Sequence, residues 1–276
     1  METRFFLSCW ANELSLKRAI EEAVGRGYHG VEGPLPREAR KREEALELLV
    51  QSKLPFIAEV VTGGGYVPDL KASVEEHLDD LDRGLNDLTG WSPIRVNVLG
   101  GSDQWNLNKA VDFITSGMAL VEKYGHPVSW ETHRSRPTFH PGPTLELLAE
   151  IPEMRLTVDF SHWCVVCERA ELGQDVLEAV AERARHIHAR IGHEQGPQVH
   201  DPEDRRYADT RQVHLDWWTF LRGRAAGRGA SLFTVTPEFG PDGYGPVSLS
   251  RGRQTGPGLR ETNEWVVKFL SSAWEL

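Results

Sequence analysis

Short apolar runs alternate with amphipathic stretches from one end of the chain to the other. The runs have the length of β-strands and are bounded by turn-forming or charged residues, which predicts strands. They are Arg4–Ser8, Tyr28–Glu32, Pro55–Val61, Ile94–Leu99, Pro127–Thr132, Arg155–Phe160, Ala184–Arg190 and Leu232–Pro237. Between them apolar residues return every three or four positions, which predicts helices. Examples are Leu16 and Ile20, Val74 to Leu88, Val111 to Val121, and Trp265 to Leu270.

Strands that alternate with helices over 276 residues have the size and rhythm of a (β/α)₈ barrel, which takes roughly 250 residues. A doubly wound open sheet is the alternative, and it usually carries a glycine-rich turn after its first strand. Here that turn reads Cys9-Trp-Ala-Asn12, without glycine. The sequence therefore favours α/β architecture, with residues 1–276 forming a single (β/α)₈ TIM barrel domain.

Two long polar connections follow the seventh and eighth predicted strands, at about residues 191–213 and 240–258. In such a barrel both leave the C-terminal face, where the active sites of this fold lie. Loops of this length inside compact domains are often lids or binding loops. We therefore expect both connections on the catalytic face.

Polar residues stand at or just past the tips of four successive strands: Glu131, Asp159, His188 and Glu238. The tips of parallel barrel strands converge at one mouth, so these side chains should meet there. Three carboxylates and an imidazole suit one divalent cation such as Mn²⁺ or Mg²⁺. Any one of them alone would equally serve as a helix cap or ion-pair partner, so the prediction of a metal centre depends on the ordered set.

In order and strand number, this set resembles the metal and catalytic pattern of the xylose isomerase-like TIM barrels, the sugar phosphate isomerase/epimerase family. His162, three residues after Asp159, belongs to the same pattern. The resemblance covers most of the chain in its strand and helix rhythm and is specific in the second half. It implies that Glu131 and Glu238 combine metal ligation with proton transfer and that Asp159 and His188 hold the ion. His162 would lie beside the substrate oxygens.

The function that the resemblance implies is isomerisation or epimerisation of a sugar or keto-sugar. One divalent ion per chain (Mn²⁺, Mg²⁺, Co²⁺ or Zn²⁺) would stabilise an enediolate, while two carboxylates act as base and acid. A dehydratase or lyase that acts on a keto-cyclitol or a 3-keto-glycoside stays open, because it begins with the same C–H cleavage. Product mass would separate the two alternatives.

Four further residues are candidates for substrate contact. His133 and Arg190 follow Glu131 and His188 by two positions, so each should face the same side as its ligand. Support of the metal ligands is the alternative for both. Trp10 and Trp105 follow strand ends and could stack on a sugar ring, although such residues also serve as core. The keto-sugar epimerases place their substrate arginine further along than Arg190, so the substrate stays open.

Two other function classes are less favoured. Apurinic endonucleases use a trinuclear zinc cluster with histidines from early strands, but the segments 61–65 and 99–103 contain none. A second ion could still take His193, His200 and Asp201 from the long loop. A non-catalytic binding protein would hold no metal and would show no change in stability with a chelator.

Net charge and cysteine content limit the partners and the cellular compartment that we expect. The net charge of −10 argues against nucleic acid or an anionic membrane as partner, because both need a basic patch. No apolar run approaches the roughly 20 residues of a membrane span, and the start does not read as a signal peptide. Three cysteines make no disulfide framework, so Cys164 and Cys167 are interpreted as packed thiols. We expect a cytoplasmic enzyme for a small-molecule substrate, with a homodimer as an open alternative.

Overall fold

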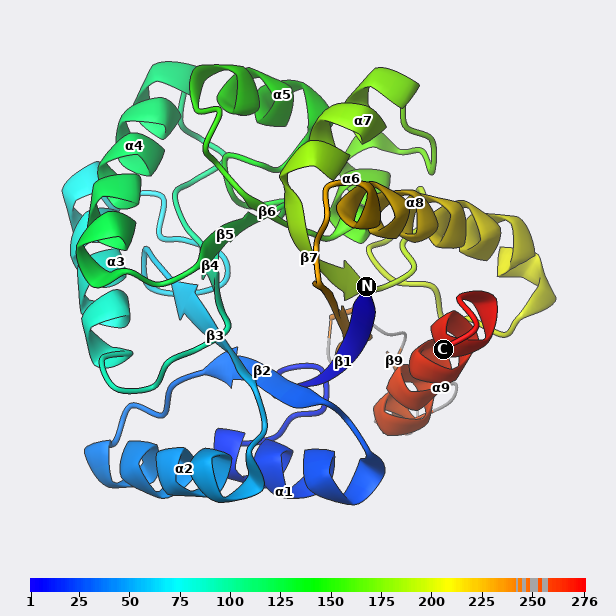
Figure 1. Cartoon of the computed structure of the whole chain (residues 1–276). Helices are drawn as coiled ribbons and strands as arrows, with labels where there is room; N and C mark the ends of the chain where they lie inside the picture. The colour runs from blue at the N-terminus through cyan, green and yellow to red at the C-terminus, as the bar shows by residue number, and fades with distance from the viewer. Residues whose placement is uncertain (242, 245–246, 249–252, 255–257) are drawn as a thin grey trace.

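The computed structural model describes residues 1–241, 243–244, 247–248, 253–254 and 258–276. Parallel strands pair in chain order from β1 to β8, and β8 pairs back with β1, so the sheet closes into a barrel (Figure 1). The strands are β1 (Glu2–Ser8), β2 (Gly30–Pro34), β3 (Phe56–Val61), β4 (Arg95–Leu99), β5 (Val128–Glu131), β6 (Leu156–Val158), β7 (Ala184–Ala189) and β8 (Leu232–Pro237). The predicted (β/α)₈ architecture is confirmed.

The helices form a ring outside the barrel (Figure 1). They are α1 (Leu16–Arg26), α2 (Ala39–Ser52), α3 (Val74–Asp87), α4 (Leu107–Tyr124), α5 (Pro141–Glu150), α6 (Phe160–Cys167), α7 (Gln174–Arg183), α8 (Ala208–Gly227) and α9 (Leu259–Ala273). Local sequence explains their ends: Ser73 and Glu76 form a capping box at the start of α3, and Gly27 ends α1 with a φ of 73° that L side chains disfavour. Within the described part of the chain, no helix combines the length and apolar character needed to cross a bilayer.

The two long connections turned out differently from each other. The first is shorter than expected, because a 3₁₀ turn at Arg205–Tyr207 leads directly into α8 at Ala208. The predicted loop at 240–258 falls largely on residues outside the described part. Within that range, β9 (Val247–Ser248) and β10 (Arg253–Gln254) pair antiparallel.

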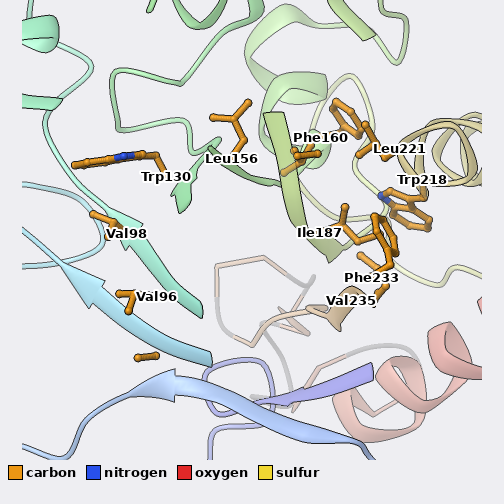
Figure 2. Packing of buried hydrophobic residues seen from close by; sticks show 14 of the residues in the cluster. Val96, Val98, Trp130, Leu156, Phe160, Ile187, Trp218, Leu221, Phe233 and Val235 are labelled. Atoms are coloured by element: carbon orange, nitrogen blue, oxygen red, sulfur yellow. The ribbon is translucent and has the colours of Figure 1, made fainter. Parts of the chain in front are cut away.

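The outward faces of the strands make the hydrophobic core. Phe56, Ala58 and Val60 of β3 are buried in one cluster with residues of the surrounding helices. Figure 2 shows the same arrangement on the other side, where outward residues of β7 and β8 lie beside Trp218 and Leu221 of α8. Full burial of such side chains contributes about 1.5–3 kcal/mol each. The layer between sheet and helices therefore holds the barrel together.

The inward faces are largely polar, whereas barrels of this fold are mostly filled by branched apolar residues. Buried inward residues include Glu32, Asn97, Glu131, Thr157, His186, His188, Thr234 and Thr236. Burying polar groups is unfavourable unless they are hydrogen-bonded, so these side chains must bond to one another in a network. That network is the floor of the candidate site.

Candidate metal centre

The four predicted metal ligands meet at the C-terminal mouth of the barrel. Glu131 ends β5, Asp159 caps the N-terminus of α6, His188 lies in β7 and Glu238 follows β8. All four are buried, and one ligand atom from each lies within 4.8 Å of the others. The predicted strand at Arg155–Phe160 is shorter than expected, because Asp159 accepts the Ser161 N–H and starts a helix there.

An unpaired imidazole nitrogen marks where an ion would bind. Nδ1 of His188 is buried and makes no hydrogen bond with any residue that the structure describes. It lies 3.1 Å from Oε2 of Glu238 and 3.7 Å from Oε1 of Glu131. An imidazole nitrogen that faces carboxylate oxygens is a donor set that suits Mn²⁺, Mg²⁺, Co²⁺ or Zn²⁺. Against the effect of burial, Glu238, Glu32 and Glu131 hold the pKa of His188 well above its ordinary value, so an ion would replace a proton on this ring. The residues present therefore fit a divalent ion.

The two glutamates of the set differ in their affinity for a proton. Burial raises the pKa of Glu131, but His188, His133 and a hydrogen bond from Asn97 outweigh it and lower the pKa to about 2. At Glu238 burial dominates, and the pKa is raised above the ordinary value. Pairs of carboxyl groups with separated pKa values are typical of acid and base partners.

Arg190 is built into the ligand set. Its Nη2 donates to Oδ2 of Asp159 and lies 3.6 Å from Oε2 of Glu238. Its Nε donates to the Ser161 hydroxyl at 2.9 Å. The side chain is 1% exposed, so it neutralises and orients the Asp159 carboxylate as well as bordering the cavity.

A cavity of about 260 Å³ opens directly above these residues. It is lined by Trp10, Glu59, Tyr66, Val67, Leu99, Glu131, His133, Arg134, His162, Arg190, Glu238 and Tyr244. Four of the five predicted substrate residues are therefore at its wall. Trp105 is not, because its ring packs against His77 and Phe113, with centroids 4.8 Å and 5.4 Å away.

The three residues considered for a second ion are not brought together with the first site. His193 forms a local bridge with Gly196, and Asp201 accepts the Glu203 N–H at 2.9 Å. Among the described residues, the groups with metal-binding spacing do not include them or His200. A different second group exists: Glu131, His133 and His162 also offer ligand atoms within 4.8 Å of one another.

His133 and His162 stand against each other at the cavity wall, with ring centroids 4.1 Å apart. Burial lowers the pKa of His133 to about 3 and that of His162 well below its ordinary value. Both rings are therefore neutral at pH 7. Nδ1 of His162 is buried without a partner, so it can exchange a hydrogen bond with a bound molecule.

Sequence reasoning missed Glu32, which lies beneath the ligands. Its Oε1 is 3.0 Å from Nε2 of His188, its Oε2 is 3.0 Å from Nε2 of His186, and Thr236 donates to Oε2. Burial would raise the pKa of Glu32, but the two histidines hold it far below its usual range. His186 lies inside the barrel beside His188 and is fully buried. The available signal was an acidic residue closing an apolar strand.

Glu59 and Asn97 were missed as well. Glu59 borders the cavity, its Oε1 has no partner, and burial raises its pKa to about 8. Asn97 donates to Oε2 of Glu131 at 2.6 Å, while its own Oδ1 is buried without a partner. An acidic residue in the middle of the apolar run Phe56–Val61 was the available signal.

We compared the chain with known protein families, curated proteins and solved structures. No family model matches the sequence, and no curated protein matches it. A D-allulose 3-epimerase from Methylomonas sp., solved in complex with D-allulose, has a TM-score of 0.64 and 15% identity and covers 98% of both chains. A probable 3-DHS dehydratase from Bacillus anthracis has a TM-score of 0.58 and 14% identity, and it covers 87% of this chain and 94% of its own.

A third solved structure, a xylose isomerase-like TIM barrel protein from Mycobacterium smegmatis in complex with magnesium, has a TM-score of 0.59 and 11% identity and covers 99% of both chains. At these identities the likeness concerns the fold. The chain has the fold of the xylose isomerase-like barrels, as the strand order of its polar residues predicted.

Proposed function

We propose that this protein is a divalent-metal-dependent isomerase or epimerase of a sugar or keto-sugar. One observation carries the proposal: ligand atoms of Glu131, Asp159, His188 and Glu238 converge beneath a cavity of about 260 Å³. Structural neighbours that include an epimerase bound to D-allulose and a barrel bound to magnesium support the choice of substrate class and cofactor.

Each residue of the site has a separate role in removing a proton from a substrate carbon and returning it. A bound divalent ion supplies Lewis-acid stabilisation of negative charge that develops on the substrate oxygens. Glu131 is ionised and is the base that takes the proton from carbon, while Glu238 keeps a proton more readily and returns one. His162 is neutral and partnerless at Nδ1, so it bonds to a substrate oxygen. Buried Arg190 holds Asp159 in place.

A dehydratase or lyase is the second candidate. Glu59 favours it, because a carboxyl with a pKa of about 8 keeps its proton at neutral pH and faces the cavity. Such an acid can protonate a departing hydroxyl after the same C–H cleavage. The similarity of fold to a probable 3-DHS dehydratase agrees with this alternative.

The test combines metal analysis with one substitution. We expect about one divalent ion per chain and turnover of ketoses such as D-fructose or D-allulose. Glu238→Gln should lower kcat by about 10²–10⁴-fold, the usual contribution of a general acid or base, with an unchanged circular dichroism spectrum. Glu194→Gln, at an exposed glutamate after β7, is the matched control and should keep full activity.

The outcomes separate the candidates. Products of unchanged mass indicate isomerisation or epimerisation, whereas loss of water indicates the dehydratase. Full activity in Glu238→Gln would contradict the two-carboxylate mechanism. A protein that binds no metal and shows no thermal shift with Mn²⁺ would contradict the metal centre altogether.

A further inference from the structure

Two histidines of β7 share one carboxylate inside the barrel. Glu32 projects from β2 and is 2% exposed. It gives one oxygen to each ring: Oε1 lies 3.0 Å from Nε2 of His188, and Oε2 lies 3.0 Å from Nε2 of His186. The bonds join strands that are not neighbours in the sheet. Glu32 therefore links β2 to β7 across the interior.

The two histidines use their second nitrogens differently. Nδ1 of His186 lies 2.8 Å from the Thr234 hydroxyl, so both nitrogens of that ring are engaged within the protein. Nδ1 of His188 has no hydrogen-bond partner in the described part of the chain, and it faces Glu131 and Glu238. His186 is therefore an anchor for Glu32, while His188 has one nitrogen free for a ligand.

The chemistry of the carboxylate fixes which nitrogen of His188 carries hydrogen. An ionised carboxylate only accepts hydrogen bonds, so Nε2 of His188 must donate to Glu32. With hydrogen held on Nε2, the lone pair that remains for coordination is that of Nδ1. Carboxylates that accept from the far nitrogen of a metal-binding histidine set its orientation and raise its basicity.

We infer that Glu32 is a positioning residue that holds Nε2–H of His188 and directs Nδ1 toward Asp159, Glu131 and Glu238. The inference rests on the proposed function for the part that concerns the metal. The orientation of the ring is a property of the metal-free protein and can be measured without any ion or substrate.

The first readout is a ¹H–¹⁵N correlation spectrum of metal-free protein with ¹⁵N-labelled histidine, in which His188→Asn assigns the signal. We expect the Nε2 proton of His188 to resonate far downfield, as protons bonded to carboxylates do. Glu32→Gln should move it upfield. Glu59→Gln makes the same substitution on the neighbouring strand, at a side chain with no bond to His188, and should leave it in place.

The second readout is the Kd for Mn²⁺ by titration calorimetry. Loss of the partner of a metal-binding histidine typically weakens metal binding by about 10–100-fold, and we expect that range for Glu32→Gln. Glu47→Gln, at an exposed glutamate of α2, is the control for this readout and should leave the Kd unchanged, because it leaves the His188 bond intact.

Three results would decide against the inference or against its basis. A His188 ring with hydrogen on Nδ1 and none on Nε2 overturns it, as does an unchanged Mn²⁺ Kd in Glu32→Gln. A wild-type protein that binds no Mn²⁺ contradicts the proposed function, while the Nε2–H signal still decides the role of Glu32. Should Glu32→Gln fail to fold, the wild-type signal alone tests the orientation.

Discussion

Glu32 and Glu59 are inward carboxyl groups on adjacent strands, yet their surroundings give them opposite charge states. Glu32 has two imidazoles and the Thr236 hydroxyl as partners, and its pKa lies far below the ordinary value. Glu59 has an unpartnered Oε1, and burial raises its pKa to about 8. Desolvation acts on both, so the partners decide which group is ionised.

The difference divides the barrel interior into two regions with different roles. Around Glu32 both carboxylate oxygens and both nitrogens of His186 have hydrogen-bond partners, and these bonds hold His188. Around Glu59 the acceptors Glu59 Oε1 and Asn97 Oδ1 have no donor among the residues that the structure describes. Buried polar atoms without partners are unfavourable, and Glu59 borders the cavity. This second region therefore offers hydrogen bonds to whatever occupies the cavity.

Replacing the glutamate of each region by leucine should give the largest difference in the free energy of unfolding. Glu32→Leu removes the acceptor of His186, His188 and Thr236, so it should lower the free energy of unfolding by about 3–5 kcal/mol, as loss of one partner of a buried ion pair does. Glu59→Leu removes a carboxyl that must take up a proton when the chain folds at pH 7, so it should raise the free energy of unfolding rather than lower it. Urea unfolding at pH 7 measures both.

Equal losses of stability in the two leucine variants would contradict the division of the interior. The m-value is the control: if it is unchanged, the variants differ in stability and not in the extent of structure that unfolds.

The fold was predictable because its signals are local and repeated. The run Leu232–Pro237 coincides with β8, and Ala184–Arg190 exceeds β7 by one residue. Alternating apolar segments specify strands and helices wherever one face must be buried. The short strand β6 was overextended, since Asp159 reads as strand in the sequence but caps α6 through its bond to the Ser161 N–H.

The candidate site was predictable only in part. Glu131, Asp159, His188 and Glu238 could be found because they end strands in a fixed order. Pairing across the barrel could not, because nothing near Glu32 in the sequence indicates that its partners lie 154 and 156 positions away. Trp105 shows the reverse error: its place after a strand suggested the cavity, but packing against His77 and Phe113 turned it to the core.

The pH dependence of stability tests whether Glu59, unlike Glu32, is protonated in the folded protein. Folded Glu59 holds its proton up to about pH 8, whereas unfolded glutamate releases it near 4.5. Between these values the folded state binds more protons, so this group lowers the free energy of unfolding as pH rises. Glu59→Gln removes the effect, and its gain over wild type should be about 3 kcal/mol larger at pH 8.5 than at pH 5.5.

Unfolding curves of both proteins at the two pH values provide the measurement. A gain that is the same at pH 5.5 and pH 8.5 would mean that Glu59 is ionised in the folded protein at both pH values. Glu47→Gln, at an exposed glutamate of α2, is the control for charge alone and should show no such difference.

The smallest expected effect separates the partners of Glu32 from one another. Thr236→Val removes the hydroxyl that donates to Oε2 and nearly keeps the volume, while both imidazoles stay. One hydrogen bond of this kind contributes about 1 kcal/mol, so the free energy of unfolding should fall by that amount. The Nε2–H signal of His188 should stay downfield, because its acceptor is Oε1. A loss as large as that of Glu32→Leu would mean that the hydroxyl, and not the histidine pair, keeps Glu32 ionised inside the barrel.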